Sequence, residues 1–69
     1  MNNSQQFIKR VKDSLDKKDV NLYGSYIHLI REGGYEKSFQ AYLNMMNGAV
    51  KMDAETLYQM ADAFDIKIN

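Results

Sequence analysis

The sequence predicts an all-α protein, a compact bundle of four to five short helices that forms a single domain over residues 1–69. Three observations predict this class. Apolar residues recur at the spacing of a helix face in four successive segments. No pair of alternating segments indicates a β-hairpin. The chain is short and has no cysteine, so a hydrophobic core must hold the fold without disulfides or thiolate-bound zinc.

The first two helices are predicted from stripes of apolar residues and from the residues that end them. The first helix covers residues 7–18, and its core-facing residues are Phe7, Ile8, Val11 and Leu15. The second begins after Asn21, a favourable N-cap, and its stripe is Leu22, Tyr23, Tyr26, Ile27 and Ile30. Gly33 and Gly34 are expected to stop it, because glycine is unfavourable inside a helix and readily takes the left-handed geometry that closes one.

The third and fourth helices have clearer boundaries. The third begins near Ser38, ends at Asn47-Gly48, and has the stripe Phe39, Tyr42, Leu43 and Met46. The fourth begins after Asp53, whose carboxylate suits the positive end of the helix dipole, and its stripe is Leu57, Met60, Ala61 and Phe64. Residues 66–69 alternate like a short extended tail, which we expect to be a loose end or an edge strand in a homodimer.

The residue types present give little support to catalysis or to metal binding. His28 is the single histidine. A nucleophile needs an activating base and an orienting group, and zinc needs at least three protein ligands. The Gly33-Gly34 pair follows a helix and lacks the spacing of a phosphate-binding loop. We therefore expect a protein that is not an enzyme and that binds no cofactor and no metal.

Hydropathy and the amino-terminal residues indicate the compartment. No apolar run approaches the roughly 18–20 residues that span a membrane. The start, residues 1–6, is polar and uncharged apart from the terminus, unlike a secretory signal. These features predict a soluble cytoplasmic protein with no membrane partner.

The second half of the chain carries an ordered series of motifs. A helix over residues 39–48 closes with Asn-Gly, a loop over residues 49–52 follows, and Asp53 caps the segment Glu55–Ile66. This series resembles the Cro and lambda-repressor type of helix-turn-helix regulator, whose pattern reads Glu-Thr-Leu-x-x-Ile-Ala-x-Ala-Leu-x-Val. Met60, Phe64 and Ile66 stand at its Ile, Leu and Val positions. Residues 7–18 look like the first helix of that family, whereas residues 31–37 predict a longer second helix and an enlarged turn.

The resemblance implies a small transcriptional regulator of a phage or mobile-element genetic switch, acting in the cytoplasm of a bacterial host. Its third helix would enter the major groove of double-stranded operator DNA. The exposed positions of that helix would then be Gln40, Asn44 and Asn47, with Ala41 small enough for close approach, and Gln and Asn are suited to the edge of adenine. The phosphate contacts would come from Lys37 before the helix and Lys51 after it.

The charge distribution keeps a second class of function open. The formal net charge is +0, and residues 38–48 contain no Lys or Arg, although most DNA affinity comes from neutralising phosphates. The alternative is an antirepressor-like protein that binds a repressor or another partner protein and has little DNA affinity. The residues predicted for that interface are Tyr35, Met45, Val50 and Met52. A more remote alternative is an inhibitor of a host nucleic-acid enzyme on the same scaffold.

Overall fold

The computed structural model describes residues 3–67, and in this range it contains four α-helices and no strand, which confirms the predicted all-α class. The first helix, α1, spans Asn3–Lys17. Its predicted stripe is confirmed, because all four apolar residues are buried: Phe7, Ile8, Val11 and Leu15. Asp19, which takes a left-handed conformation with φ 56°, follows the helix and redirects the chain.

The second helical segment consists of α2, Leu22–His28, continued without a break by a single π-helical turn, η1, at Leu29–Gly33. The predicted cap is confirmed, because the Asn21 Oδ1 atom accepts a hydrogen bond from the Gly24 amide at 2.7 Å. The predicted stop is also confirmed, because Gly34 takes the left-handed conformation at φ 75°. The π-helical turn was not predicted, although the extension of this helix to residue 33 agrees with the sequence.

The helices α3, Phe39–Met46, and α4, Ala54–Phe64, begin at the predicted caps. The Ser38 Oγ atom accepts from the Ala41 amide at 3.2 Å, and the Asp53 Oδ1 atom accepts from the Thr56 amide at 2.9 Å. Both bonds satisfy amides that the first turn of a helix leaves unpaired. After α3, Gly48 takes the left-handed conformation at φ 79°.

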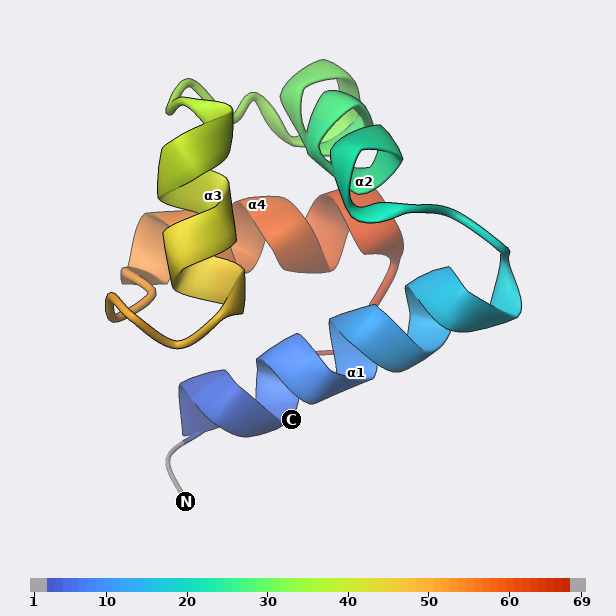
Figure 1. The fold of residues 1–69 in the computed structure, drawn as a ribbon, viewed down its shortest axis with the longest axis horizontal. Coiled ribbons are helices and arrows are strands. Elements are labelled where there is room, and N and C mark those ends of the chain that lie inside the picture. The colour runs from blue at the N-terminus through green and yellow to red at the C-terminus, as the bar shows by residue number, and fades with distance from the viewer. Residues whose placement is uncertain (1–2, 68–69) are drawn as a thin grey trace.

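The core lies where the four helices meet. In Figure 1, α4 crosses the middle of the molecule, α1 lies on one side of it, and α2 and α3 lie on the other. The largest fully buried apolar side chains come from α1, the π-helical turn, α3 and α4: Val11, Leu29, Tyr42, Met46 and Met60. The Tyr42 hydroxyl is hydrogen-bonded to the Ser25 hydroxyl at 2.9 Å, so the buried polar atoms of α2 and α3 satisfy each other.

Three of the four residues predicted for a protein interface belong to this core, and the prediction was wrong for them. Tyr35, Met45 and Met52 are only 3%, 4% and 6% exposed. The Tyr35 ring packs edge-on against the Tyr42 ring, with 5.9 Å between the ring centroids, so it faces the core and not the solvent. Val50 remains a candidate for a protein interface, because half of its surface is exposed.

The end of the described chain folds back on α1. The Ile66 amide donates to the Ala61 carbonyl at 3.0 Å, and the Arg10 guanidinium donates to the Lys67 carbonyl at 3.0 Å. Residues 66 and 67 form no strand, and residues 68 and 69 of the predicted tail lie outside the described residues. Among helices of the described range, none is long and apolar enough to cross a membrane.

Candidate nucleic-acid interface

The solvent-facing side of α3 carries a row of uncharged polar residues. Gln40 and Asn47 are exposed and Asn44 is half-buried. These positions fall on one face because successive residues of a helix are rotated by about 100°. The opposite face is buried through Tyr42 and Met46. The structure therefore places the predicted Gln40, Asn44 and Asn47 together on one accessible helix face.

The first two side-chain amides of this row, those of Gln40 and Asn44, are hydrogen-bonded to each other. The Gln40 Nε2 atom donates to the Asn44 Oδ1 atom at 3.1 Å, a bond between residues one helical turn apart. It leaves the carbonyl oxygen of Gln40 as an acceptor and the amide hydrogens of Asn44 as donors. An acceptor next to a donor is the pattern that complements the N6 and N7 atoms on the major-groove edge of adenine.

The loop after α3 is folded against the end of the helix. The amides of Ala49 and Val50 both donate to the Asn44 carbonyl, at 2.8 and 3.3 Å. This folding brings the loop beside the polar row, where a hollow of about 150 Å³ is formed. The hollow brings together four of the predicted DNA-binding residues: Lys37, Ala41, Asn44 and Lys51. Val50 also lines this hollow, next to Lys51.

One carboxylate lies among these lysines. The Lys37 ammonium is 3.3 Å from the Asp53 carboxylate, and both side chains are more than half exposed. Hydrogen bonds from Thr56, followed by the interaction with Lys37, lower the pKa of Asp53 to about 2. Asp53 is therefore ionised at neutral pH, and it offsets the charge of Lys37 locally. Lys51 has no acidic partner among the described residues.

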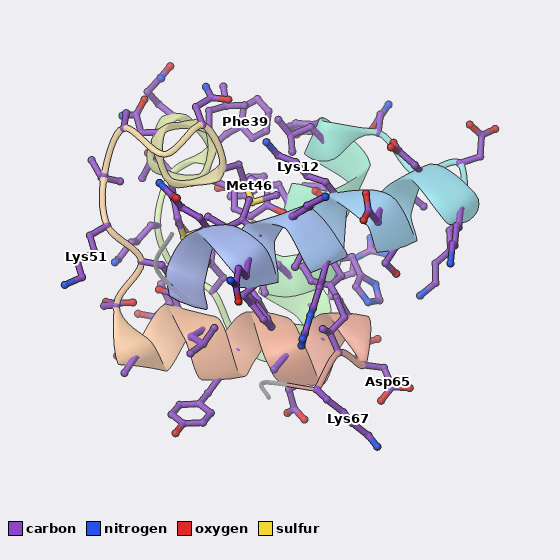
Figure 2. The ribbon with its side chains drawn as sticks, turned by 90° about the horizontal axis from the view of Figure 1, so that it is seen from below. Lys12, Phe39, Met46, Lys51, Asp65 and Lys67 are labelled. Atoms are coloured by element: carbon purple, nitrogen blue, oxygen red, sulfur yellow. The ribbon has the colours of Figure 1, made fainter. Side chains whose placement is uncertain are left out.

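The other side of the polar row is bounded by α1, which the sequence did not predict. A groove of about 250 Å³ brings Lys9 and Lys12 next to Asn47 and Gly48. In Figure 2, Lys12 and Lys51 lie on either side of α3. The signal in the sequence was the position of these lysines beside Ile8, at the edge of the buried stripe, but their distance from α3 depends on how the helices pack.

The described residues hold no cluster of three or more His, Asp or Glu side chains that could bind a metal ion. The arrangement around α3 offers hydrogen bonds and positive charge, which are the interactions of a binding surface. Comparison with family models, with curated proteins and with solved structures finds no match to this chain.

Proposed function

We propose that this protein is a small helix-turn-helix regulator that binds operator DNA through α3 and acts in a phage or mobile-element genetic switch. The observation that carries the proposal is the polar row of α3 with lysines on both sides. Lys37 and Lys51 lie on one side of the row, and Lys9 and Lys12 lie on the other. A helix in the major groove has a phosphate backbone on each side of it, so this distribution of charge suits that position.

The roles of the residues follow from their chemistry. Gln40 and Asn44 would read base edges and favour A·T pairs, because their linked amides present an acceptor beside a donor. Ala41, which is half-buried, would allow the groove wall to approach closely. The lysines would contact phosphates and fix the register of the complex without reading sequence. The consecutive α2–η1 and α3 helices would be the two helices of such a motif, and residues 34–38 would form a turn longer than the roughly three to four residues that are usual.

The same charges predict weak binding that depends strongly on salt. Each neutralised phosphate contributes roughly −0.9 to the slope of log K against log salt concentration. Lys37 contributes less than a free lysine, because Asp53 lies 3.3 Å from it. Three to four effective contacts correspond to a slope of roughly −3 to −4.

The decisive experiment is a fluorescence anisotropy titration with A·T-rich operator fragments between about 50 and 200 mM salt. Gln40→Ala and Asn44→Ala are expected to weaken a specific complex by about 1–3 kcal/mol each. Gln6→Ala, an exposed amide on α1 away from the groove, is the matched control and should leave affinity unchanged. An absence of binding at about 50 mM salt would exclude DNA recognition by this surface.

A second variant pair tests the phosphate contacts. Lys12→Gln should reduce the magnitude of the salt slope by about one for every sequence. Lys17→Gln, on the same helix but outside the groove beside α3, should leave the slope unchanged. If the two substitutions reduce the salt slope equally, DNA affinity depends on the total charge of the protein and not on lysines placed beside α3.

The antirepressor-like alternative is favoured by a different observation, on α4. Glu55, Tyr58 and Asp62 are exposed at positions three and four apart, so they share one outer face. Tyr58 is 63% exposed, and an aromatic ring between two carboxylates suits a basic protein surface. Calorimetric titration with the repressor of the same genetic element tests this function. Glu55→Lys with Asp62→Lys should abolish such binding, and Gln40→Ala should not affect it.

A further inference from the structure

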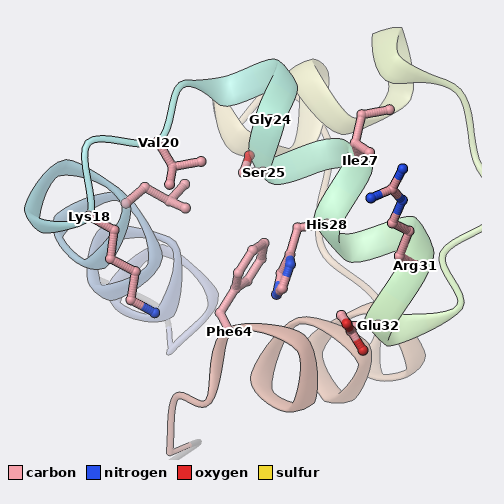
Figure 3. A pocket seen from close by; sticks show the side chains of 10 residues that line it. Lys18, Val20, Gly24, Ser25, Ile27, His28, Arg31, Glu32 and Phe64 are labelled. Atoms are coloured by element: carbon pink, nitrogen blue, oxygen red, sulfur yellow. The ribbon is translucent and has the colours of Figure 1, made fainter.

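A pocket of about 390 Å³ lies away from the α3 surface. It is formed between the end of α1, the α2–η1 helix and the end of α4 (Figure 3). None of its lining residues belongs to α3 or to the hollow and groove beside it. Its volume falls within the range of about 300–1,000 Å³ that is typical of small-molecule sites.

The inner surface of the pocket is mainly apolar. Leu15, Val20 and Ile27 contribute aliphatic side chains, and Phe64 contributes an aromatic ring. The His28 ring stacks on Phe64, with 5.6 Å between the centroids and 27° between the planes. These groups form a surface on which a hydrocarbon or an aromatic ring would be removed from water.

Two polar side-chain atoms of the pocket, His28 Nε2 and Ser25 Oγ, are already committed to other bonds. The His28 Nε2 atom is 2.7 Å from the Ala63 carbonyl, which only accepts, so Nε2 carries the hydrogen. The Ser25 Oγ atom is hydrogen-bonded to the Leu22 carbonyl and to the Tyr42 hydroxyl. The inner wall therefore offers few polar groups to a ligand, which favours an apolar ligand body.

The rim of the pocket carries positive charge. Lys18 and Arg31 stand on opposite sides of it in Figure 3, and both are exposed. Within the described residues neither side chain has an ion-pair partner. Glu32 is the only acidic residue of the lining, so the rim has an excess of one positive charge. Arginine is suited to a carboxylate because its planar guanidinium donates two parallel hydrogen bonds.

We propose that this pocket binds a small amphipathic carboxylate, with its apolar body against Phe64 and its carboxylate at Arg31. Lys18 adds attraction across the opening at longer range. This inference is independent of the proposed function, because no residue of the pocket takes part in the α3 surface. The chemistry identifies the ligand class as a carboxylic acid with a short aliphatic chain or one aromatic ring.

The experiment uses the full chain and octanoate as the probe, followed by two-dimensional NMR of the backbone amides. Octanoate should cause saturable shifts at Gly24 and His28 and should raise the melting temperature through preferential binding to the folded state. Arg31→Gln should weaken octanoate binding about tenfold, the value of one charge-assisted hydrogen-bonded contact at an open site. Lys17→Gln removes a neighbouring exposed lysine that does not line the pocket, and it should have no effect.

A neutral probe separates charge recognition from apolar adsorption. 1-Octanol should bind wild type more weakly than octanoate does, and its affinity should be the same for wild type and Arg31→Gln. The proposal is overturned if octanoate produces no saturable shifts at millimolar concentration. It is also overturned if Arg31→Gln and Lys17→Gln have equal effects, or if the shifts lie around Asn44 instead.

Discussion

The buried hydroxyl pair of Ser25 and Tyr42 allows a sharp prediction about stability. Both residues have no exposed surface, and their oxygen atoms are 2.9 Å apart. The Ser25 hydroxyl is also 2.6 Å from the Leu22 carbonyl oxygen. The pair thus connects α2 to α3 at the centre of the molecule, and substitutions of its two members are not equivalent.

The direction of each hydrogen bond follows from the donors available. A carbonyl oxygen only accepts, so the one hydrogen of the Ser25 hydroxyl is used by Leu22. Tyr42 must then donate to Ser25. Burial raises the pKa of the Tyr42 phenol, which outweighs the lowering by the Ser25 bond, so the phenol is protonated at neutral pH and has a hydrogen to donate.

The magnitudes follow from what each substitution leaves behind. Tyr42→Phe removes the donor, but the Ser25 hydroxyl keeps its bond to Leu22, so the expected loss is about 0.5–1.5 kcal/mol. Ser25→Ala leaves the Tyr42 hydroxyl buried without an acceptor, and the expected loss is about 1–3 kcal/mol. In the double variant Ser25→Ala with Tyr42→Phe, no buried hydroxyl lacks a hydrogen-bond partner, so this variant should be no less stable than Ser25→Ala alone.

Urea denaturation followed by far-ultraviolet circular dichroism measures these free energies of unfolding. For a domain of this size, 1 kcal/mol corresponds to a change of about 4–8 °C in melting temperature. The reasoning is refuted if Tyr42→Phe is more destabilising than Ser25→Ala, or if the double variant loses the sum of the two single effects.

Three further predictions use the same measurement. Gly33→Ala should destabilise the protein by about 1–3 kcal/mol, because the added Cβ would lie 2.8 Å from a backbone oxygen of α4. Gly34→Ala has open space around the added Cβ, with nothing within 4 Å, so it should cost only about 1–2 kcal/mol, the strain of a left-handed alanine at φ 75°. Asp53 has a pKa of about 2 in the folded protein against about 3.9 unfolded, so its ionised form stabilises the fold above pH 4. That stability should be lost as the pH falls from about 4 to about 2, and Asp53→Asn, which keeps a capping side chain, should show a smaller loss over this range. Met45→Ala should destabilise by about 2–5 kcal/mol because its side chain is buried, whereas the exposed Val50→Ala should stay within about 0.5 kcal/mol of wild type; similar values would contradict the burial of Met45.

The helix boundaries were predictable because the groups that define them are close in sequence. Asn21, Ser38 and Asp53 each accept a hydrogen bond from an amide three residues later, so the cap is contained in a short segment. Likewise, Gly34 and Gly48 take the left-handed conformation that a helix-terminating glycine prefers. The polar face of α3 was predictable for the same reason, since it follows from helical periodicity alone.

The features that depend on packing between helices were not predictable in this way. Met45 lies outside the strict apolar stripe of α3, but it is buried, and it lines the same hollow as Val50 of the following loop and Thr56 of α4. Tyr35 follows a glycine pair and looks like a loop residue, but its ring packs on Tyr26 and Tyr42 from other segments. The approach of Lys12 to α3 has the same origin, because α1 is distant from α3 in sequence.

The π-helical turn at Leu29–Gly33 allows the second helical segment to hold one more residue without rotating the residues that follow it. An extra residue in an ordinary α-helix rotates everything after it by about 100°, which would move a buried face into solvent. A turn closed five residues back, as between the Gly34 amide and the Leu29 carbonyl, accommodates one additional residue locally. A chain one residue shorter in this turn should therefore close it as an ordinary α-helical turn and keep Tyr35, which follows the turn, packed on Tyr42.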